Sequence, residues 1–257
     1  IMNIPIAHIH GGEVTEGAYD EAIRHSISKM AHIHFVAAPE YRKRVIQLGE
    51  NPKSVFMVGG LGVDAMKGLK LLDKINLEKA MNFKFGQRNL LVTIHPETLT
   101  LKDQQLKNAK TLLAALKTIR ETNFIFTLPN ADHYNEQITH LIKDFCFKHS
   151  KNCWLYSSLG QLKYFSSLQY VDGVIGNSSS GLLEVPSFKK GTINLGNRQD
   201  GRLKAASVID CDYDKNKILQ AVKKLYSNNF QTKLASVKNP YGAAGASLKI
   251  HNKISTI

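Results

Sequence analysis

The 257-residue chain lacks an apolar run long enough to cross a bilayer, and no charged and apolar secretory leader opens it. A soluble protein is therefore expected, with no membrane partner. Cysteine is scarce: Cys146, Cys153 and Cys211 are an odd number and show no metal-ligand spacing. Because a chain of this length buries a sizeable core without disulfides, reduced thiols and a cytoplasmic location are expected.

Acidic residues are few relative to basic ones, since 21 Asp and Glu stand against 34 Lys and Arg and leave a formal charge of +13. Nucleic acid, an anionic small substrate or solubility alone would each account for such a charge. The basic residues form short scattered clusters at 42–44, 189–190 and 223–224, without the interleaved aromatics that stack on bases. Nucleic acid is therefore not an expected partner.

Short apolar runs alternate with amphipathic segments along the chain. The segment Asp20–Met30 places its apolar residues on one helical face, and the segment 106–119 does the same. The alternation predicts an α/β fold of βαβ units with a mostly parallel sheet, in which ligands bind beyond the carboxyl ends of the strands. The expected strands are Ile4–Ile9, Ile33–Ala37, Val55–Val58, Leu90–Ile94, Phe124–Leu128, Cys153–Tyr156, Val171–Ile175 and Thr192–Leu195.

A loop rich in glycine and serine follows the apolar run 171–175 and leads into an expected helix. Backbone N–H groups and hydroxyls of such a loop converge on one point, which suits an anion. We interpret it as a diphosphate cradle, with a small polar turn as the alternative. Glu184, expected near the start of the helix, is suited to accept bonds from ribose hydroxyls or simply to favour the helix N-terminus. The loop consists of Gly176, Asn177, Ser178, Ser179, Ser180 and Gly181.

Two further strand ends carry polar groups toward the same edge of the sheet. The expected strand 192–195 leads to Arg198 and Arg202, whose guanidinium groups match phosphate oxygens in fork geometry, or else belong to a solvated loop. His95 follows another strand, where an imidazole contacts a leaving phosphate or moves a proton, although a turn residue is the alternative.

The opening segment is rich in titratable groups. His8 and His10 are two apart on an expected strand and so face the same side. With His32 and His34 they admit a metal site, which keeps a metal-dependent hydrolase as an alternative. The chain has no His-Glu-x-x-His motif and no cysteine ligands, so no metal is expected.

Five segments in this order resemble the hydrolysing UDP-N-acetylglucosamine 2-epimerases. Each is weak alone, but their order and spacing across essentially the whole chain make the resemblance specific. They are the residues 7–13 (AHIHGGE), 20–25 (DEAIRH), 95–96 (HP), 176–181 (GNSSSG) with Glu184, and 194–199 (NLGNRQ).

The resemblance implies a glycosyltransferase-B-like architecture, in which two Rossmann-type halves with parallel sheets face each other across a cleft. Residues 1–66 would form the first half, with a helix within 241–257 packing back on it, and residues 67–240 the UDP-binding half. The implied reaction releases UDP and N-acetylmannosamine through a glycal intermediate, without a cofactor. The resemblance also implies a homo-oligomer, a dimer or tetramer. The implied role is in sialic or related nonulosonic acid synthesis.

The resemblance also implies the roles of individual residues. The catalytic residues would be Glu13, Asp20, Arg24 and His95. The UDP-binding residues would be Asn130, Asn177, Ser178, Ser179, Ser180, Gly181, Glu184 and Arg198.

Two departures from the family pattern leave alternatives open. The chain begins at Ile1, just before a strand from the middle of the family's first half, so we expect an incomplete first half whose exposed edge is covered by dimerisation or rearrangement. Some relatives have Glu where His10 stands, and either His10 or Glu13 would substitute. A related epimerase for a UDP-diacetamido-trideoxyhexose, or a UDP-sugar binding module without catalysis, are the remaining alternatives.

Overall fold

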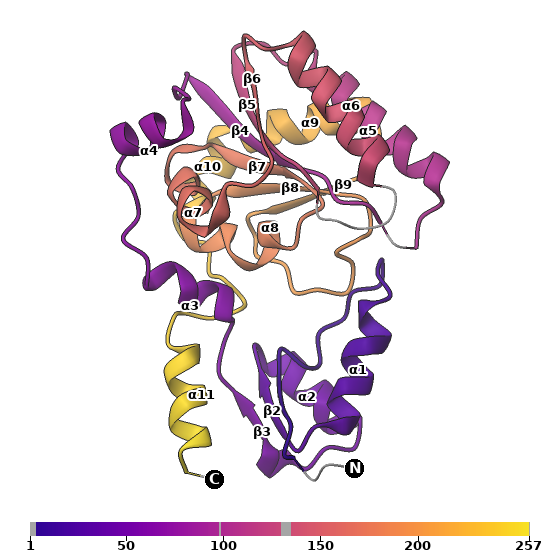
Figure 1. The fold of residues 1–257 in the computed structure, drawn as a ribbon, viewed down its shortest axis with the longest axis vertical. Helices are drawn as coiled ribbons and strands as arrows, with labels where there is room; N and C mark the ends of the chain where they lie inside the picture. The colour runs from indigo at the N-terminus through magenta and orange to yellow at the C-terminus, as the bar shows by residue number, and fades with distance from the viewer. Residues whose placement is uncertain (1–3, 98, 130–134, 257) are drawn as a thin grey trace.

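The computed structural model describes residues 4–97, 99–129 and 135–256. They contain a three-stranded sheet of order β1-β2-β3 and a six-stranded sheet of order β6-β5-β4-β7-β8-β9, which lie at opposite ends of the molecule in Figure 1. Each strand pair in both sheets is parallel. The α/β class with parallel sheets expected from the sequence is confirmed.

The smaller sheet lies with α1 and α2 at one end of the molecule (Figure 1). Its first strand is shorter than expected, because the N–H of Ile6 donates to His32 Nδ1 (3.2 Å) and strand pairing starts only at Ala7. The helix expected at Asp20–Met30 is confirmed. The elements are β1 (Ala7–Ile9), α1 (Asp20–Met30), β2 (Ile33–Val36), α2 (Pro39–Gln47), η1 (Pro52–Ser54) and β3 (Val55–Met57).

The larger sheet contains one strand that the sequence did not predict, the edge strand β9. The helix expected to include Ile119 ends before it, at Leu116. The elements are α3 (Leu61–Lys67), α4 (Lys74–Met81), β4 (Arg88–Thr93), α5 (Lys102–Leu116), β5 (Thr122–Thr127), α6 (Asn135–Lys148), β6 (Cys153–Tyr156), α7 (Gly160–Tyr170), β7 (Gly173–Gly176), α8 (Ser180–Leu183), η2 (Val185–Phe188), β8 (Gly191–Leu195), β9 (Val208–Cys211), α9 (Lys215–Leu225), α10 (Asn228–Leu234) and α11 (Ala246–Ile254).

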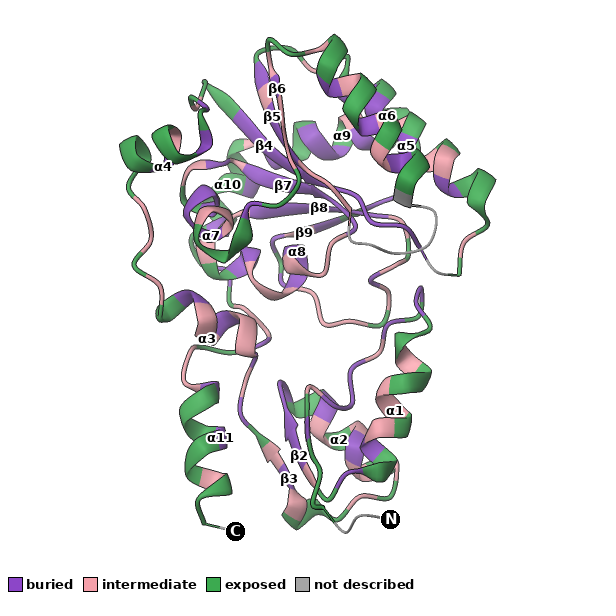
Figure 2. Ribbon diagram, viewed as in Figure 1, coloured by how far each residue is buried: buried purple, intermediate pink, exposed green. Residues whose placement is uncertain are grey.

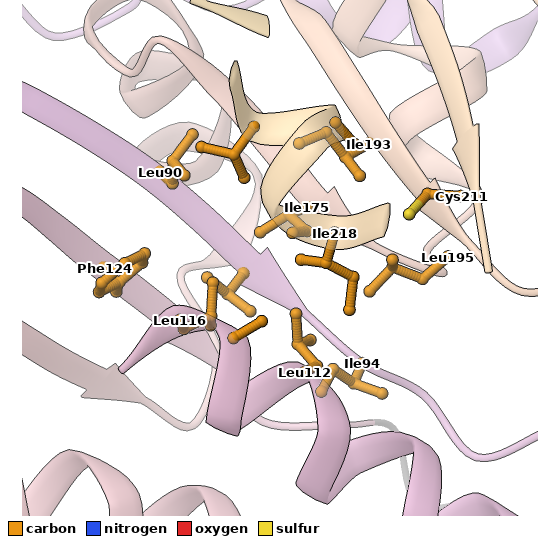
Figure 3. Close-up of a cluster of buried hydrophobic side chains, with 14 of the residues drawn as sticks. Leu90, Ile94, Leu112, Leu116, Phe124, Ile175, Ile193, Leu195, Cys211 and Ile218 are labelled. Carbon is orange, nitrogen blue, oxygen red and sulfur yellow. The ribbon is translucent and has the colours of Figure 1, made fainter. Parts of the chain in front are cut away.

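The central strands of the larger sheet are buried on both faces, as Figure 2 shows. Successive side chains of β4 alternate between two clusters: Leu90 and Val92 pack with α5 and α9 (Figure 3), and Leu91 packs on the other side with α4 and α7. Full burial of such a side chain contributes about 1.5–3 kcal/mol. This two-sided burial explains why the strands read as continuous apolar runs.

The strand order places the chain reversal of the larger sheet between β4 and β7. In order of sequence the six strands lie 3-2-1-4-5-6, which is the arrangement of a Rossmann-type sheet. Ligands of such sheets bind at the carboxyl ends of the two strands where the order reverses. Here those ends carry His95 after β4 and the Gly-Ser loop after β7.

The C-terminal helix α11 packs back on the smaller sheet. Ala246 and Ile250 are buried against Phe35 of β2 and Val58, which follows β3. The helix runs beside the smaller sheet in Figure 1. The domain boundaries at residues 66 and 240 remain predictions.

Apolar side chains remain exposed on the first strand of the smaller sheet and just before it. Ile4, Ile6 and Ile9 are 61%, 42% and 40% exposed. The homo-oligomer stays a prediction. None of the described helices is long and apolar enough to span a bilayer.

The three cysteines are unpaired and buried. Burial raises the pKa of Cys146 and Cys153 to about 12 and that of Cys211 to about 11, so all three are neutral thiols of low reactivity. The cytoplasmic location stays a prediction.

Candidate active site

The Gly-Ser loop turns tightly against the end of β4. Gly176 has a φ of +147°, and a Cβ built on it would lie 1.8 Å from the carbonyl oxygen of Thr93. Only glycine fits this approach of two backbones. The turn sends the loop over the sheet edge and into the short helix α8.

Asn177 holds three loops together beneath this edge. Its Oδ1 accepts from the N–H of His95 (2.7 Å), and its Nδ2 donates to the carbonyl of His95 (2.9 Å) and to Glu97 Oε1 (3.4 Å). Its own carbonyl accepts from Arg198 Nη1 (3.1 Å) and Gln199 Nε2 (2.9 Å). Asn177 is 0% exposed, so its side chain lies under the loops and not in a cavity.

A cavity of about 370 Å³ opens at the carboxyl ends of β4, β5 and β6. His95, Ser178 and Ser180 line it, together with Tyr164 and Gln161. Ser180 is fixed by a hydrogen bond between its hydroxyl and that of Tyr164. The structure therefore brings together three of the residues predicted from the sequence, from two separate strand ends.

The smaller sheet contributes a buried carboxylate hydrogen-bonded to an imidazole. His10 leaves β1 with a φ of +63°, and its Nδ1 lies 2.7 Å from Glu13 Oε1. The N–H of Leu61 donates to His10 Nε2 (3.3 Å), so the ring proton belongs on Nδ1 and is donated to Glu13. His10 thus orients the carboxylate of Glu13.

Since His10 leaves the strand, the expectation that His8 and His10 face the same side is wrong. The side chain of His8 is buried and contacts Ser28 (3.0 Å).

Two arginines face Glu13 besides His10. Arg202 Nη2 lies 3.4 Å from Glu13 Oε2, and Arg24 Nη1 donates to the carbonyl of Glu13 (3.1 Å). Burial alone would raise the pKa of Glu13, but the hydrogen bond from His10 and the charges of Arg202 and Arg24 together lower it. Glu13 is only 3% exposed and is therefore a buried carboxylate, ionised at neutral pH.

A second cavity, of about 290 Å³, lies between the two sheets and contains this carboxylate. Its walls come from both sides: Glu13, His10 and Arg24 from the smaller sheet and its helices, and Ser179 and Arg202 from the larger. The sides also meet beyond the cavity, where the N–H of Glu16 donates to the carbonyl of Asp200 (3.0 Å). Ser179 faces this cavity while Ser178 and Ser180 line the other, so the Gly-Ser loop is a wall shared by both.

Glu184 lies at the edge of the same cleft, where α8 ends and the 3-10 helix η2 begins. A Cβ on Gly62 would lie 2.3 Å from Glu184 Oε1, so the carboxyl group closes on the start of α3. Its Oε2 is buried without a hydrogen-bond partner. Burial raises the pKa of Glu184 to about 7, and the charge of Arg202 offsets this only in part.

We expect Glu184→Gln to flatten the pH dependence of stability. A carboxyl group whose pKa rises on folding favours the folded state below its unfolded pKa, near 4.5, and this contribution is lost as pH rises through 7. The native chain should lose up to about 2 kcal/mol between pH 5 and pH 8, after allowance for partial exposure. Thermal unfolding across this range measures the effect. The exposed Glu40→Gln is the control, and equal pH profiles for the native chain and Glu184→Gln would contradict the assignment.

Other predicted residues lie elsewhere. Asp20 is exposed on the first turn of α1 and does not line the cleft cavity. Gly181 is buried against Thr192, and Arg198 contacts the carbonyl of Asn177, the neighbouring loop. Asn130 lies outside the described residues.

The described residues offer no ligand set for the alternative of a metal-dependent hydrolase. Within the part of the chain that the structure describes, no group of three or more His, Cys, Asp and Glu side chains is arranged to hold a metal ion. His34 instead faces Glu50, with Nε2 3.3 Å from its carboxylate.

A larger cavity, of about 850 Å³, opens beside β8 and β9 and is not the candidate site. Its lysines are already paired with carboxylates: Lys204 with Asp210 (2.8 Å) and Lys217 with Asp212 (2.5 Å). A diphosphate there would have to displace both ion pairs. The smaller cavities around the Gly-Ser loop present hydroxyls and arginine instead.

Sequence reasoning missed part of the cleft. It placed Arg202 on a phosphate-binding loop but not against Glu13, and it gave no role to Tyr241, which also lines the cleft. No local pattern marks Tyr241, because it reaches the site only through the return of the C-terminal segment.

Comparison with known proteins agrees with this architecture. The family model for UDP-N-acetylglucosamine 2-epimerase matches residues 1–255. The chain is 44% identical over 231 residues to a hydrolysing GDP/UDP-N,N'-diacetylbacillosamine 2-epimerase of Campylobacter jejuni, covering 90% of the chain and 59% of the relative. It is also 44% identical over 243 residues to the polysialic acid biosynthesis protein P7 of Escherichia coli, covering 93% and 60%.

A solved structure shows the same fold. The UDP-N-acetylglucosamine 2-epimerase of Neisseria meningitidis, bound to its UDP-sugar, superimposes with a TM-score of 0.81 at 21% identity, over 99% of this chain and 70% of that one. The two facing parallel sheets thus define a glycosyltransferase-B-like α/β protein. More particularly, the chain belongs to the UDP-N-acetylglucosamine 2-epimerase family. It spans about 60% of the length of the two curated relatives named above.

Proposed function

We propose that the protein is a hydrolysing UDP-N-acetylglucosamine 2-epimerase that acts in the cleft between its two sheets. The observation that carries the proposal is the cleft cavity, where Glu13 of the smaller sheet faces Ser179 and Arg202 of the larger. A diphosphate on the Gly-Ser loop would extend its nucleoside into the cavity beside His95 and its sugar toward Glu13.

Glu13 is the base of the proposed reaction. Its carboxylate takes the proton from C2 of the sugar while the C1–O bond breaks and its electron pair leaves with UDP, which forms the glycal. Ser178, Ser179 and Arg202 stabilise the charge that develops on the diphosphate. Water then adds its hydroxyl to C1 and a proton to C2 on the opposite face, which releases the 2-epimeric sugar.

The proposal also gives roles to Glu184, Asp20 and Arg24. Glu184 would accept hydrogen bonds from ribose hydroxyls, and the lack of a protein partner for its buried Oε2 supports this role. Asp20, exposed on α1, is the weaker candidate for the base. Arg24, which holds the carbonyl of Glu13, would stabilise negative charge in the cleft.

A second substrate is favoured by one observation, the 44% identity to the Campylobacter jejuni enzyme whose name specifies N,N'-diacetylbacillosamine. A UDP-diacetamido-trideoxyhexose differs from UDP-N-acetylglucosamine at C4 and C6 and would use the same base and the same diphosphate loop. Both sugar nucleotides therefore belong in the test of function.

The test of the diphosphate site is the affinity for UDP, measured by isothermal titration calorimetry. We expect the double change Ser178→Ala, Ser179→Ala to weaken UDP binding about 150-fold, because two hydrogen bonds to a charged group are lost, each contributing about 1.5 kcal/mol. Ser236→Ala, in an exposed turn after α10, is the control and should bind like the native chain. Unchanged affinity in the double variant would contradict the assignment of the loop.

A further inference from the structure

Two buried tyrosines from distant parts of the chain meet at the wall of the cleft. Tyr41 lies on α2, and Tyr241 lies in the turn that precedes α11. They are 1% and 0% exposed, their ring centroids are 6.1 Å apart, and their hydroxyl oxygens are 3.0 Å apart. The pair joins the smaller sheet unit to the returning C-terminal segment.

Their hydroxyls close a ring of hydrogen bonds around one residue of the larger unit. The N–H of Leu203 donates to the Tyr41 hydroxyl (3.2 Å), and the Tyr241 hydroxyl donates to the carbonyl of Leu203 (3.3 Å). Because an N–H only donates and a carbonyl only accepts, the remaining proton must run from Tyr41 to Tyr241. Burial raises the pKa of both tyrosines, so both hydroxyls keep their protons at physiological pH.

Leu203, whose backbone binds both tyrosine hydroxyls, is next in sequence to an arginine in the cleft. Leu203 follows Arg202, whose Nη2 lies 3.4 Å from Glu13 Oε2 and whose Nε lies 3.4 Å from the hydroxyl of Thr15. A backbone fixed at Leu203, through both its N–H and its carbonyl, leaves Arg202 little freedom to move away from Glu13.

Helix α2, which carries Tyr41, also holds the loop of Glu13, the partner of Arg202 in this ion pair. Arg44, one turn along α2, donates to the carbonyl of Gly12, directly before Glu13. A Cβ on Gly12 would lie 2.4 Å from the carbonyl oxygen of Tyr41, so the loop rests on the backbone of α2. The same helix thus fixes the loop of Glu13 and, through the Tyr41 hydroxyl, the loop of Arg202.

We propose that Tyr41 and Tyr241 are positioning residues, whose hydroxyl ring around Leu203 sets Arg202 against the Glu13 carboxylate. The catalytic meaning of this contact rests on the proposed epimerase function, but the geometry of the ion pair does not. Without the ring, Arg202 would sample other positions and Glu13 would lose a favourable charge.

Phenylalanine substitutions separate this role from simple packing. Tyr41→Phe keeps the aromatic ring but leaves the N–H of Leu203 without its acceptor. Tyr241→Phe keeps that bond but removes the donor to the Leu203 carbonyl and the acceptor of the Tyr41 hydroxyl. Tyr226→Phe is the matched control, because it removes a tyrosine hydroxyl bonded to Asp172 in the larger unit, away from the cleft.

The experiment is an NMR pH titration of the Glu13 carboxyl carbon in the full chain, with the resonance assigned through Glu13→Gln. The other groups facing Glu13, namely His10, Arg24 and Glu184, are the same in every variant. In Tyr41→Phe the pKa of Glu13 should rise by about 1, as expected when an arginine near a carboxylate is displaced. A smaller rise is expected in Tyr241→Phe and none in Tyr226→Phe.

An unchanged pKa of Glu13 in the folded Tyr41→Phe and Tyr241→Phe variants would overturn the proposal. Should Tyr41→Phe not fold, Tyr241→Phe carries the test, since the N–H of Leu203 stays bonded in it. The titration needs no turnover, so a chain without epimerase activity would refute the proposed function and leave this test intact. Where turnover is present, kcat should fall in Tyr41→Phe, because a displaced Arg202 no longer stabilises the charge that develops on the diphosphate.

Discussion

Glu13→Gln abolishes turnover of the UDP-sugar while UDP binding persists. Glutamine has nearly the same volume and still accepts the hydrogen bond from His10, but it cannot take a proton from C2. Loss of a positioned general base costs about a thousandfold in kcat. Because UDP is expected on the Gly-Ser loop and not on Glu13, its dissociation constant should change less than about threefold.

The control for this change is Glu16→Gln. Glu16 is three residues further along the same loop and is exposed, so its substitution should leave kcat within about twofold. UDP release assayed on both variants, with calorimetric UDP binding on each, separates base chemistry from folding. A Glu13→Gln variant that retains more than about a tenth of native kcat would remove Glu13 from the mechanism and make Asp20 the next candidate.

The second large effect is expected at Asn177. In Asn177→Ala the N–H and the carbonyl of His95 lose their hydrogen bonds to the Asn177 side chain, and each lost bond to a buried group costs about 1–3 kcal/mol. The edge between β4 and β7 should loosen, with a loss of about 2–5 kcal/mol in unfolding free energy and a fall of about 100-fold in UDP affinity. Urea denaturation and calorimetry measure the two quantities.

Two further variants sharpen the test at Asn177. Asn152→Ala removes a similar side-chain bond, to the carbonyl of Thr122, before β6 at the opposite sheet edge, and should leave UDP affinity unchanged. Asn177→Asp keeps the acceptor for the N–H of His95 but places a carboxylate next to Glu97. Its stability and UDP affinity at pH 7 should therefore lie between those of the native chain and those of Asn177→Ala. Native UDP affinity in Asn177→Ala would show that the loops are held in place without this amide.

The sequence predicts the central strands well because they are buried on both faces. Leu90 to Ile94 and Val171 to Ile175 read as apolar runs between turn residues, and the structure has β4 and β7 there. The edge strand β9 escaped prediction because it is short and exposes Asp210 in its middle. Such strands depend on a neighbour, here β8, and not on their own pattern.

The sequence predicts only those parts of the candidate site whose residues lie close together along the chain. The Gly-Ser loop and His95 follow strands that the pattern identifies, and the rule of strand ends places them together. The contact of Glu13 with Arg202 and that of Tyr41 with Tyr241 join residues 189 and 200 positions apart. Those contacts follow from how the two sheets face each other, which no local periodicity encodes.

The most direct test of the central claim is an NMR time course of the native chain in D₂O, with UDP-N-acetylglucosamine and, separately, a UDP-diacetamido-trideoxyhexose. Proton removal at C2 followed by addition of solvent predicts free UDP together with a 2-epimeric sugar that carries deuterium at C2. Released sugar that keeps its C2 proton and configuration would mean simple hydrolysis of the C1–O bond. UDP binding without release of either product would leave a sugar-nucleotide binding module, and both results would contradict a base in the cleft.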